Sequence, residues 1–238
     1  MASSNAYDFS LNGNADMRLR QLGAEREPLL QVDGLLRSIE PLIAYAAEAT
    51  DFAPADGPDG GYPGLRGPAP LGYVEAVVRA VDPLLRHAFR LGSVKLGRAE
   101  CNFSLVTRPA GALVPAQRDP HIDTTDPLQF AFLHYLCGPD YGGTGFYRHR
   151  ATGFETISAD RLAAYEAARA NEAPGQGYIR GDSAAFEQIG AVDAAMNRLA
   201  VYRSHLLHSG SIAPDAPLSA NPRAGRLTAN IFVTYRRV

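Results

Sequence analysis

The stretch Arg226-Leu227-Thr228-Ala229-Asn230-Ile231, near the end of the chain, alternates polar and apolar side chains. Successive side chains of a β-strand point to opposite faces, so the polar face of this strand carries Arg226, Thr228 and Asn230, while its other face is apolar. The polar face either meets solvent, as in many antiparallel sheets, or lines the wet interior of a barrel. The pattern leaves both interpretations open.

A second segment, 100–106, repeats this arrangement, with Asn102 and Ser104 on its polar face. The segment 128–137 is instead apolar on both faces, as a central buried strand should be. Within it, Tyr135 faces away from His134, which we expect to be a hydrogen-bonded core histidine rather than a ligand. The strand period begins near residue 93 and predicts strands at 94–106, 112–122, 128–137, 144–150, 186–192, 198–204 and 226–236.

Helical spacing of apolar residues predicts helices over 34–50 and 71–91, and one later helix over 158–171. Residues 51–70 are rich in Gly, Pro and Asp, which indicates a surface loop that could serve as a lid. Helices followed by many short strands indicate a mainly β fold with N-terminal helices, in which an antiparallel barrel or sandwich is buttressed by those helices.

No internal repeat or domain-sized linker interrupts the chain, so we expect a single domain over residues 1–238. Residues 1–92 should provide a helical support and a loop, and residues 93–238 the β core. The 46% hydrophobic and 20% charged residues are typical of a soluble globular protein with a sizeable core.

The net charge of −2 gives no electrostatic reason to expect nucleic acid or an anionic membrane as a partner. The N-terminal segment is polar, and no apolar run approaches the length of a membrane span, so we expect a cytoplasmic protein. Cys101 and Cys137 lie in apolar runs and are expected to be buried free thiols.

The motif His121-Ile122-Asp123 closes the expected strand at 112–122. Residues i and i+2 of a strand point the same way, so His121 and Asp123 can present an imidazole and a carboxylate to one point. Downstream, His205 and His208 each offer a third ligand. Two histidines and one carboxylate suit non-haem Fe(II), because three coordination positions stay open. Taken alone, a His-x-Asp pair is also compatible with a polar pair on a surface turn.

Five short motifs follow one another in an order that resembles the iron(II)/2-oxoglutarate-dependent oxygenases. The resemblance is to the prolyl-hydroxylase-like branch, including a bacterial subgroup of that superfamily, and it covers about residues 100–238. The motifs are His121-Ile122-Asp123, Phe132-Leu133-His134-Tyr135-Leu136, Gly142-Gly143-Thr144-Gly145-Phe146-Tyr147, His208-Ser209-Gly210 and Gly225-Arg226-Leu227-Thr228.

The resemblance implies a double-stranded β-helix, that is, a jelly-roll, cupin-like core. It also implies an Fe(II) site built from His121, Asp123 and a distal histidine. His208 fits that distal position better than His205, because it is followed by Ser-Gly and comes after a strand, as the family's distal histidine does. His205 stays as the alternative ligand or as a structural residue.

The same resemblance implies a site for the cosubstrate 2-oxoglutarate. Arg226 matches the family's basic residue that pairs with the distal carboxylate of 2-oxoglutarate, a task that suits a guanidinium fork. Thr228, on the same face, could add a hydroxyl contact. Tyr135 matches the tyrosine that shares this carboxylate in the prolyl-hydroxylase branch, and Asn102 could form part of the pocket wall.

A protein of this family would consume O2 and 2-oxoglutarate, hydroxylate an unactivated C–H bond and release succinate and CO2. The carboxylate of Asp123 disfavours halogenation, because it occupies the position that a halide would need. The prime substrate could be a small molecule or a peptidyl group. Its selection is expected to depend on the loops 51–70 and 213–224. The second of these makes the spacing of 18 positions between His208 and Arg226 longer than usual in the family.

Two other functions fit parts of the pattern. A cupin-like metal enzyme that does not use 2-oxoglutarate would keep the histidines but would need neither Arg226 nor Tyr135 on inward faces. A non-catalytic barrel that binds a ligand would show no affinity for Fe(II) and no turnover of 2-oxoglutarate.

Overall fold

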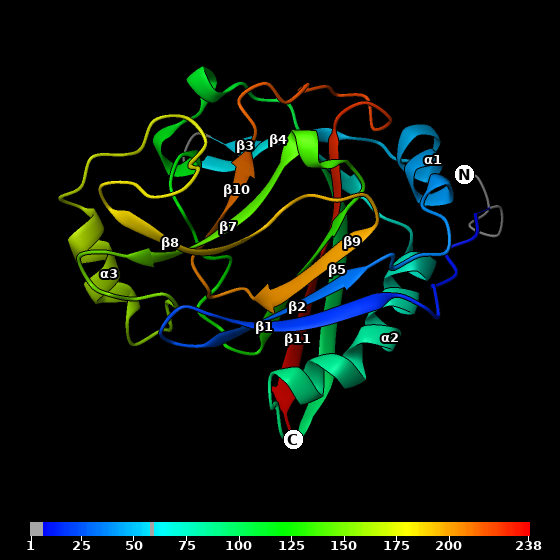
Figure 1. The fold of residues 1–238 in the computed structure, drawn as a ribbon, viewed down its shortest axis with the longest axis horizontal. Coiled ribbons are helices and arrows are strands. Elements are labelled where there is room, and N and C mark those ends of the chain that lie inside the picture. The colour runs from blue at the N-terminus through cyan, green and yellow to red at the C-terminus, as the bar shows by residue number, and fades with distance from the viewer. Residues whose placement is uncertain (1–6, 58–59) are drawn as a thin grey trace.

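The computed structural model describes residues 7–57 and 60–238 (Figure 1). In this part of the chain, eight strands form one antiparallel sheet, in the spatial order β1 (Asp16–Leu22), β2 (Glu27–Asp33), β9 (Arg198–Arg203), β6 (Gln129–Tyr135), β11 (Arg226–Arg237), β5 (Val94–Val106), β4 (Gly60–Pro68) and β3 (Ala53–Gly57). A smaller antiparallel sheet contains β10 (His208–Ile212), β7 (Gly142–His149) and β8 (Phe186–Val192). The helices are α1 (Glu40–Glu48), α2 (Leu71–Ala88) and α3 (Leu162–Arg169). The expected mainly β class is confirmed.

The largest apolar core lies between the helices α1 and α2 and one face of the larger sheet. Val77 and Val81 of α2 belong to it at helical spacing, together with Leu227 and Ile231 of β11. A second core lies between the two sheets and includes side chains of β6, β7 and β9. Helix α3 lies at the opposite end of the molecule from α1, beside β8 (Figure 1).

The polar face of β11 does not meet bulk solvent. Arg226 is 4% exposed and Thr228 is 1% exposed, and both line a cavity together with Asn230. The apolar face of the same strand packs under the helices. Of the two interpretations that the alternating pattern allowed, the interior wall is therefore the one observed.

Besides the expected helices, residues 7–57 and 60–92 contain four strands, β1 to β4. The hairpin of β1 and β2 extends the larger sheet at one edge, and the hairpin of β3 and β4 extends it at the other. All residues of β1 except the last are exposed, because β1 is an edge strand. Met17 and Leu19 alternate with arginines in this strand, but both are about half exposed.

The segment 51–70 was expected to be a surface loop, and this prediction was wrong for its described residues; residues 58 and 59 lie outside them. β4 pairs with β5, with Gly64 opposite Val106 and Arg66 opposite Ser104. A Cβ on Gly64 would lie 2.0 Å from the carbonyl oxygen of Leu105. Glycine therefore allows the close approach of these two strands rather than marking a loop.

The strand expected over 112–122 is also absent. The chain instead forms short 3-10 turns at Ala110–Ala112 and Pro115–Gln117, and it pairs only through an isolated bridge at His121. Prolines 115 and 120 lack the N–H group that a strand ladder uses, which accounts for the irregular path. The later helix begins at Leu162, a few residues after the expected start.

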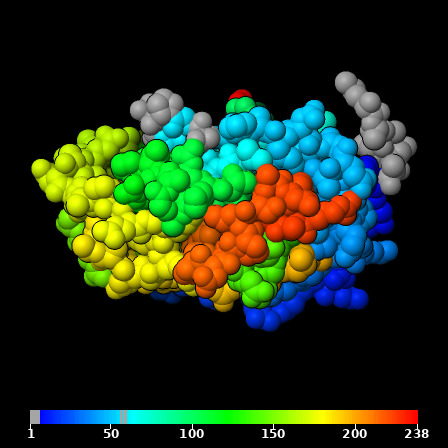
Figure 2. Space-filling view, turned by 90° about the horizontal axis from the view of Figure 1, so that it is seen from above, coloured from blue at the N-terminus to red at the C-terminus, as the bar shows by residue number. Residues whose placement is uncertain are grey.

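The segment 213–224 has no regular secondary structure, as expected for a loop inserted between β10 and β11. Figure 2 shows this segment, in orange-red, spread over one face of the molecule beside the light-blue region around α1. Arg223 forms an ion pair with Glu48 of α1, and the hydroxyl of Tyr141 donates to the carbonyl oxygen of Ala224 at 2.9 Å. The end of the loop is therefore bound to α1 and to the turn that precedes β7.

Both cysteines are free thiols, with Cys137 buried and Cys101 half-buried. Burial raises the pKa of Cys137 to about 11, so this thiol is protonated near neutral pH. None of the helices formed by the described residues has the length and apolar character needed to cross a lipid bilayer. Residues 1–6, part of the polar N-terminus on which the expectation of a cytoplasmic protein rested, lie outside the described part.

Candidate metal centre

The side chains of His121 and His208 lie side by side because their backbones form one antiparallel bridge. Each N–H donates to the other residue's carbonyl oxygen at 2.9 Å. Residues paired in this way project their side chains to the same face, and the two ring centroids are 4.6 Å apart. A single bridge thus brings together two histidines from distant parts of the chain.

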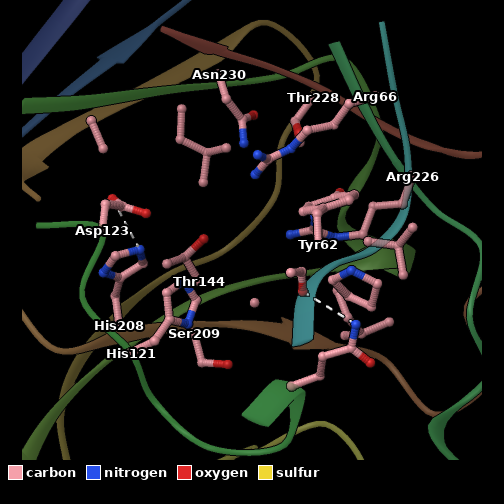
Figure 3. A pocket seen from close by; sticks show the side chains of 18 of the residues that line it. Tyr62, Arg66, His121, Asp123, Thr144, His208, Ser209, Arg226, Thr228 and Asn230 are labelled. Carbon is pink, nitrogen blue, oxygen red and sulfur yellow. Dashed lines mark hydrogen bonds and ion pairs between the residues drawn. The ribbon is translucent and has the colours of Figure 1, made fainter. Parts of the chain in front are cut away.

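Asp123 joins this pair from two positions further along. Its N–H donates to the carbonyl oxygen of Ser204 at 2.8 Å, which fixes the backbone, and its Oδ2 lies 3.6 Å from Nε2 of His208. One ligand atom from each of the three side chains lies within 4.8 Å of the other two. Figure 3 shows the three side chains grouped on one side of the cavity. Two imidazoles and one carboxylate form the donor set of the facial triad that Fe(II) takes.

A backbone carbonyl selects the tautomer of the neutral His208 ring. Its Nδ1 lies 2.8 Å from the carbonyl oxygen of Leu206, which can only accept, so Nδ1 carries the proton. The lone pair of Nε2 is then free on the side that faces Asp123. A metal-binding histidine commonly has this second hydrogen bond, which sets both its tautomer and its orientation.

His121 is also held in its neutral form. Burial, followed by the neighbouring His208, lowers its pKa to about 4, although Asp123 acts in the opposite direction. A neutral imidazole is the form that binds metals. The two imidazoles and the carboxylate therefore face the same space.

The other histidines considered from the sequence lie elsewhere. His205 is 7% exposed, has no hydrogen-bond partner on either ring nitrogen, and is not part of the three-residue group. His134 is fully buried between the hydroxyl of Tyr73, at 2.9 Å from Nδ1, and Oδ1 of Asn197, at 3.1 Å from Nε2. The prediction that His134 is a hydrogen-bonded core histidine is confirmed.

A guanidinium occupies the wall formed by the larger sheet. Nη2 of Arg226 donates to the carbonyl oxygen of Gly143 at 2.9 Å, while its Nε has no partner. The carboxylates of the described residues form no ion pair with it. The hydroxyl of Thr228, two residues further on and also facing the cavity, has no hydrogen-bond partner either.

Strand β4 adds two side chains that the sequence analysis did not identify, Tyr62 and Arg66. They lie on the same face of the strand as Gly64 and line the cavity, with the Arg66 guanidinium 4.8 Å from the centre of the Tyr62 ring. Burial raises the pKa of Tyr62, so its hydroxyl is a protonated donor at neutral pH. Once the segment is known to be a strand, the spacing Tyr62-x-Gly64-x-Arg66 places both side chains on one face.

Two other residues assigned to the cosubstrate site take different positions. The hydroxyl of Tyr135 is 2.6 Å from Oγ1 of Thr144, and the Tyr135 ring lies 5.9 Å below the Arg226 guanidinium. Tyr135 therefore supports Arg226 from behind, while Thr144 reaches the cavity surface. Asn102 is exposed and is not part of the cavity lining, so the structure does not place it at the site.

The cavity between the two walls has a volume of about 350 Å³, within the range of small-molecule sites. Its charged lining side chains are Arg66, Arg226 and Asp123, which give a net charge of +1. Figure 3 shows the arginines on the side of the cavity opposite Asp123 and His208. A site with this arrangement can hold a cation at one wall and an anion at the other.

The chain belongs to a family of unknown function (DUF6445), which it matches over residues 13–233. No curated protein matches the chain. Among solved structures it is similar to a novel N-substituted L-amino acid dioxygenase from Burkholderia ambifaria AMMD, with 10% sequence identity and a TM-score of 0.39 over 93% of this chain and 94% of that one. A likeness this distant carries no argument about function.

Proposed function

We propose that this protein is an Fe(II)- and 2-oxoglutarate-dependent dioxygenase that hydroxylates an unactivated C–H bond. In the overall reaction, the substrate C–H, O2 and 2-oxoglutarate give the substrate C–OH, succinate and CO2. His121, Asp123 and His208 would hold the iron, and Arg226 would hold a carboxylate of 2-oxoglutarate. When bound, the iron and this cosubstrate supply the activation of O2.

The observation that carries the proposal is the unpaired charge of Arg226, across the cavity from the three metal-binding side chains. A guanidinium that is 4% exposed is costly to bury unless an anion accompanies it. The described residues provide no such anion. A ligand carboxylate would supply it, and a planar guanidinium can bind that carboxylate through two parallel hydrogen bonds.

The surrounding side chains fit the same task. The hydroxyls of Tyr62 and Thr228 line the same cavity as Arg226, and each can donate to a carboxylate. On the other wall, the Leu206 carbonyl fixes the ring of His208 before any metal binds. Asp123 supplies the third ligand, which supports hydroxylation rather than halogenation.

We also propose that the core is a double-stranded β-helix and that residues 1–238 form one domain. Along the chain, strands alternate between the sheets: β5 and β6 lie in the larger one, while His121 between them bridges to β10 of the smaller one. β7 and β8 follow in the smaller sheet, β9 in the larger, β10 in the smaller and β11 in the larger. The N-terminal strands extend the larger sheet rather than forming a body of their own, which supports a single domain.

The decisive experiment is an anaerobic titration of the purified apoprotein with Fe(II) and 2-oxoglutarate. Chelation of iron by the keto acid should produce a weak visible metal-to-ligand charge-transfer band. We expect the band to be lost in both His121→Ala and Arg226→Met. Binding of Fe(II) without a band would favour a cupin-like enzyme that does not use 2-oxoglutarate, and a protein that binds no metal would contradict the proposal.

A further inference from the structure

Arg66 is a second guanidinium in the cavity, and the cosubstrate site described above does not use it. On the larger sheet, Arg66 of β4 is opposite Ser104 of β5, which is opposite Thr228 of β11. Neighbouring strands are about 4.8 Å apart, so Arg66 starts roughly 10 Å from Thr228 in the same row. Figure 3 shows its side chain reaching back into the cavity toward Thr228 and Asn230.

Arg66 has no anionic partner among the described residues. Its Nε is buried without a hydrogen bond, and its guanidinium lies over the face of the Tyr62 ring. The Nε–H group of Arg66 is a donor, and an acceptor such as a carboxylate oxygen of a ligand would satisfy it.

The charges of the cavity indicate what that ligand carries. The lining side chains have a net charge of +1, and a divalent iron raises this to +3. The dianion 2-oxoglutarate reduces the sum to +1. One further monoanionic group would make the closed site neutral, and a buried site favours neutrality because unpaired charge is costly there.

The two arginines differ in accessibility. Arg226 is nearly fully buried, whereas Arg66 is partly exposed and lies on the hairpin near the edge of the sheet. A cosubstrate anchored by Arg226 therefore occupies the inner part of the cavity. Arg66 then remains accessible to the prime substrate, which binds after the cosubstrate.

We propose that Arg66 binds a carboxylate of the prime substrate, so that the substrates are small carboxylic acids. The inference rests on the proposed function and extends it to a substrate class. A guanidinium fork matches a carboxylate, and the single remaining positive charge matches a carboxylate monoanion better than a phosphate dianion. The hydroxylated C–H bond then belongs to the part of the acid that extends from Arg66 toward His121, Asp123 and His208.

The test uses the holoprotein with Fe(II), 2-oxoglutarate and O2, and it measures succinate formed above the level without substrate. The probes are hexanoate, phenylacetate and 4-methylpentanoate, each beside its carboxamide, with hexyl phosphate as the alternative anion. We expect the acids, and not the carboxamides or the phosphate, to stimulate turnover. Arg66→Gln should weaken this stimulation by about tenfold or more, and Arg66→Lys should restore part of it.

The anaerobic charge-transfer band separates this proposal from the proposed function. Arg66→Gln should keep the band at wild-type 2-oxoglutarate concentrations, while Arg226→Met loses it. Loss of the band in Arg66→Gln would show that both arginines hold the cosubstrate and would overturn the inference. Equal stimulation by acid and carboxamide, stimulation by hexyl phosphate, or no response to any acid would also overturn it. A wild-type protein without the band would instead refute the proposed function.

Discussion

Glu155 and Arg226 are both charged side chains withdrawn from solvent, but their surroundings differ. The carboxylate of Glu155 is fully buried, and it accepts hydrogen bonds from Arg148 and from the backbone N–H groups of Ala24 and Glu25. Arg226 donates to one carbonyl oxygen and meets no carboxylate. Among the described residues, Glu155 thus has a partner of opposite charge, and Arg226 in the cavity has none.

The two regions therefore have different effects on stability. The network around Glu155 joins the turn between β1 and β2 to β7, and loss of one partner would leave a buried charge uncompensated. The unpaired arginines of the cavity destabilise the empty protein and become favourable when an anion binds. Ligand binding should accordingly stabilise this fold by mass action.

The largest effect should follow from removal of a metal ligand, which tests whether the unpaired cavity is a metal and anion site. His208→Ala should lower Fe(II) affinity by about 1000-fold or more, because loss of a mere supporting contact already costs about 10–100-fold. His205→Asn is the matched control, a histidine three residues away that should leave the affinity close to wild type. Equal losses in both variants, measured by anaerobic Fe(II) titration, would contradict the assignment of His208.

Arg226→Met should give the next largest effect and separates binding from stability. Loss of two charge-assisted hydrogen bonds should weaken 2-oxoglutarate binding by about 100-fold, or about 3 kcal/mol. The ligand-free variant should be as stable as the wild type or more stable, because an unpaired buried charge is removed. Isothermal titration and urea unfolding of the same preparation measure both quantities. A clearly less stable ligand-free variant would show that Arg226 is structural.

The placement of Asp123 beside His121 could be predicted from the sequence because it depends on local spacing, whereas His208 reaches them from a distant part of the chain. The spacing of His121 and Asp123 places both on one side even though the expected strand is only an isolated bridge. The alternation around Arg226 and Thr228 likewise identified their common face. The choice between solvent and interior for that face could not be made from the pattern, since it depends on whether a second sheet covers it.

The cavity side chains of β4, Tyr62 and Arg66, could not be predicted in the same way. Tyr62 and Arg66 lie among glycines and prolines that are typical of loops, and only pairing with β5 turns this segment into a strand. The position of Asn102 outside the cavity lining has a related reason. Alternation assigned it to the same face as Ser104, but it does not show where along the strand the cavity ends. These outcomes depend on contacts between distant segments.

Glu155→Gln should have a moderate effect, on stability alone. It keeps the shape of the side chain but removes the buried one of the two carboxylates that pair with Arg148, the other being Glu187. Loss of one partner from a fully buried pair costs about 3–5 kcal/mol, and because Arg148 is 27% exposed we expect about 2 kcal/mol from urea unfolding. The double variant with Arg148→Met should recover part of this loss. If the unfolding free energy of Glu155→Gln equals that of the wild type, the contrast between Glu155 and Arg226 does not hold.

The smallest effect should be the pH dependence contributed by Glu25, a second carboxylate of the paired region. Burial alone would raise its pKa, but hydrogen bonds from the Thr156 hydroxyl, the Glu155 N–H and Arg161 outweigh burial and lower it below the ordinary value of 4.5. A lowered pKa means that the unfolded chain binds protons more readily, so this contribution is complete above pH 4.5 and declines as the pH falls toward the lowered pKa.

Unfolding free energies measured across this acidic range should therefore fall less steeply for Glu25→Gln than for the wild type. Glu75→Gln, which removes one carboxylate from an exposed position of α2, is the matched control for the change in net charge. If the two variants flatten the curve equally, the effect is one of overall charge rather than of pairing. A steeper curve for Glu25→Gln would mean that folding raises the pKa of Glu25 instead of lowering it. The Glu25 carboxylate would then be destabilised in the folded protein, unlike that of Glu155.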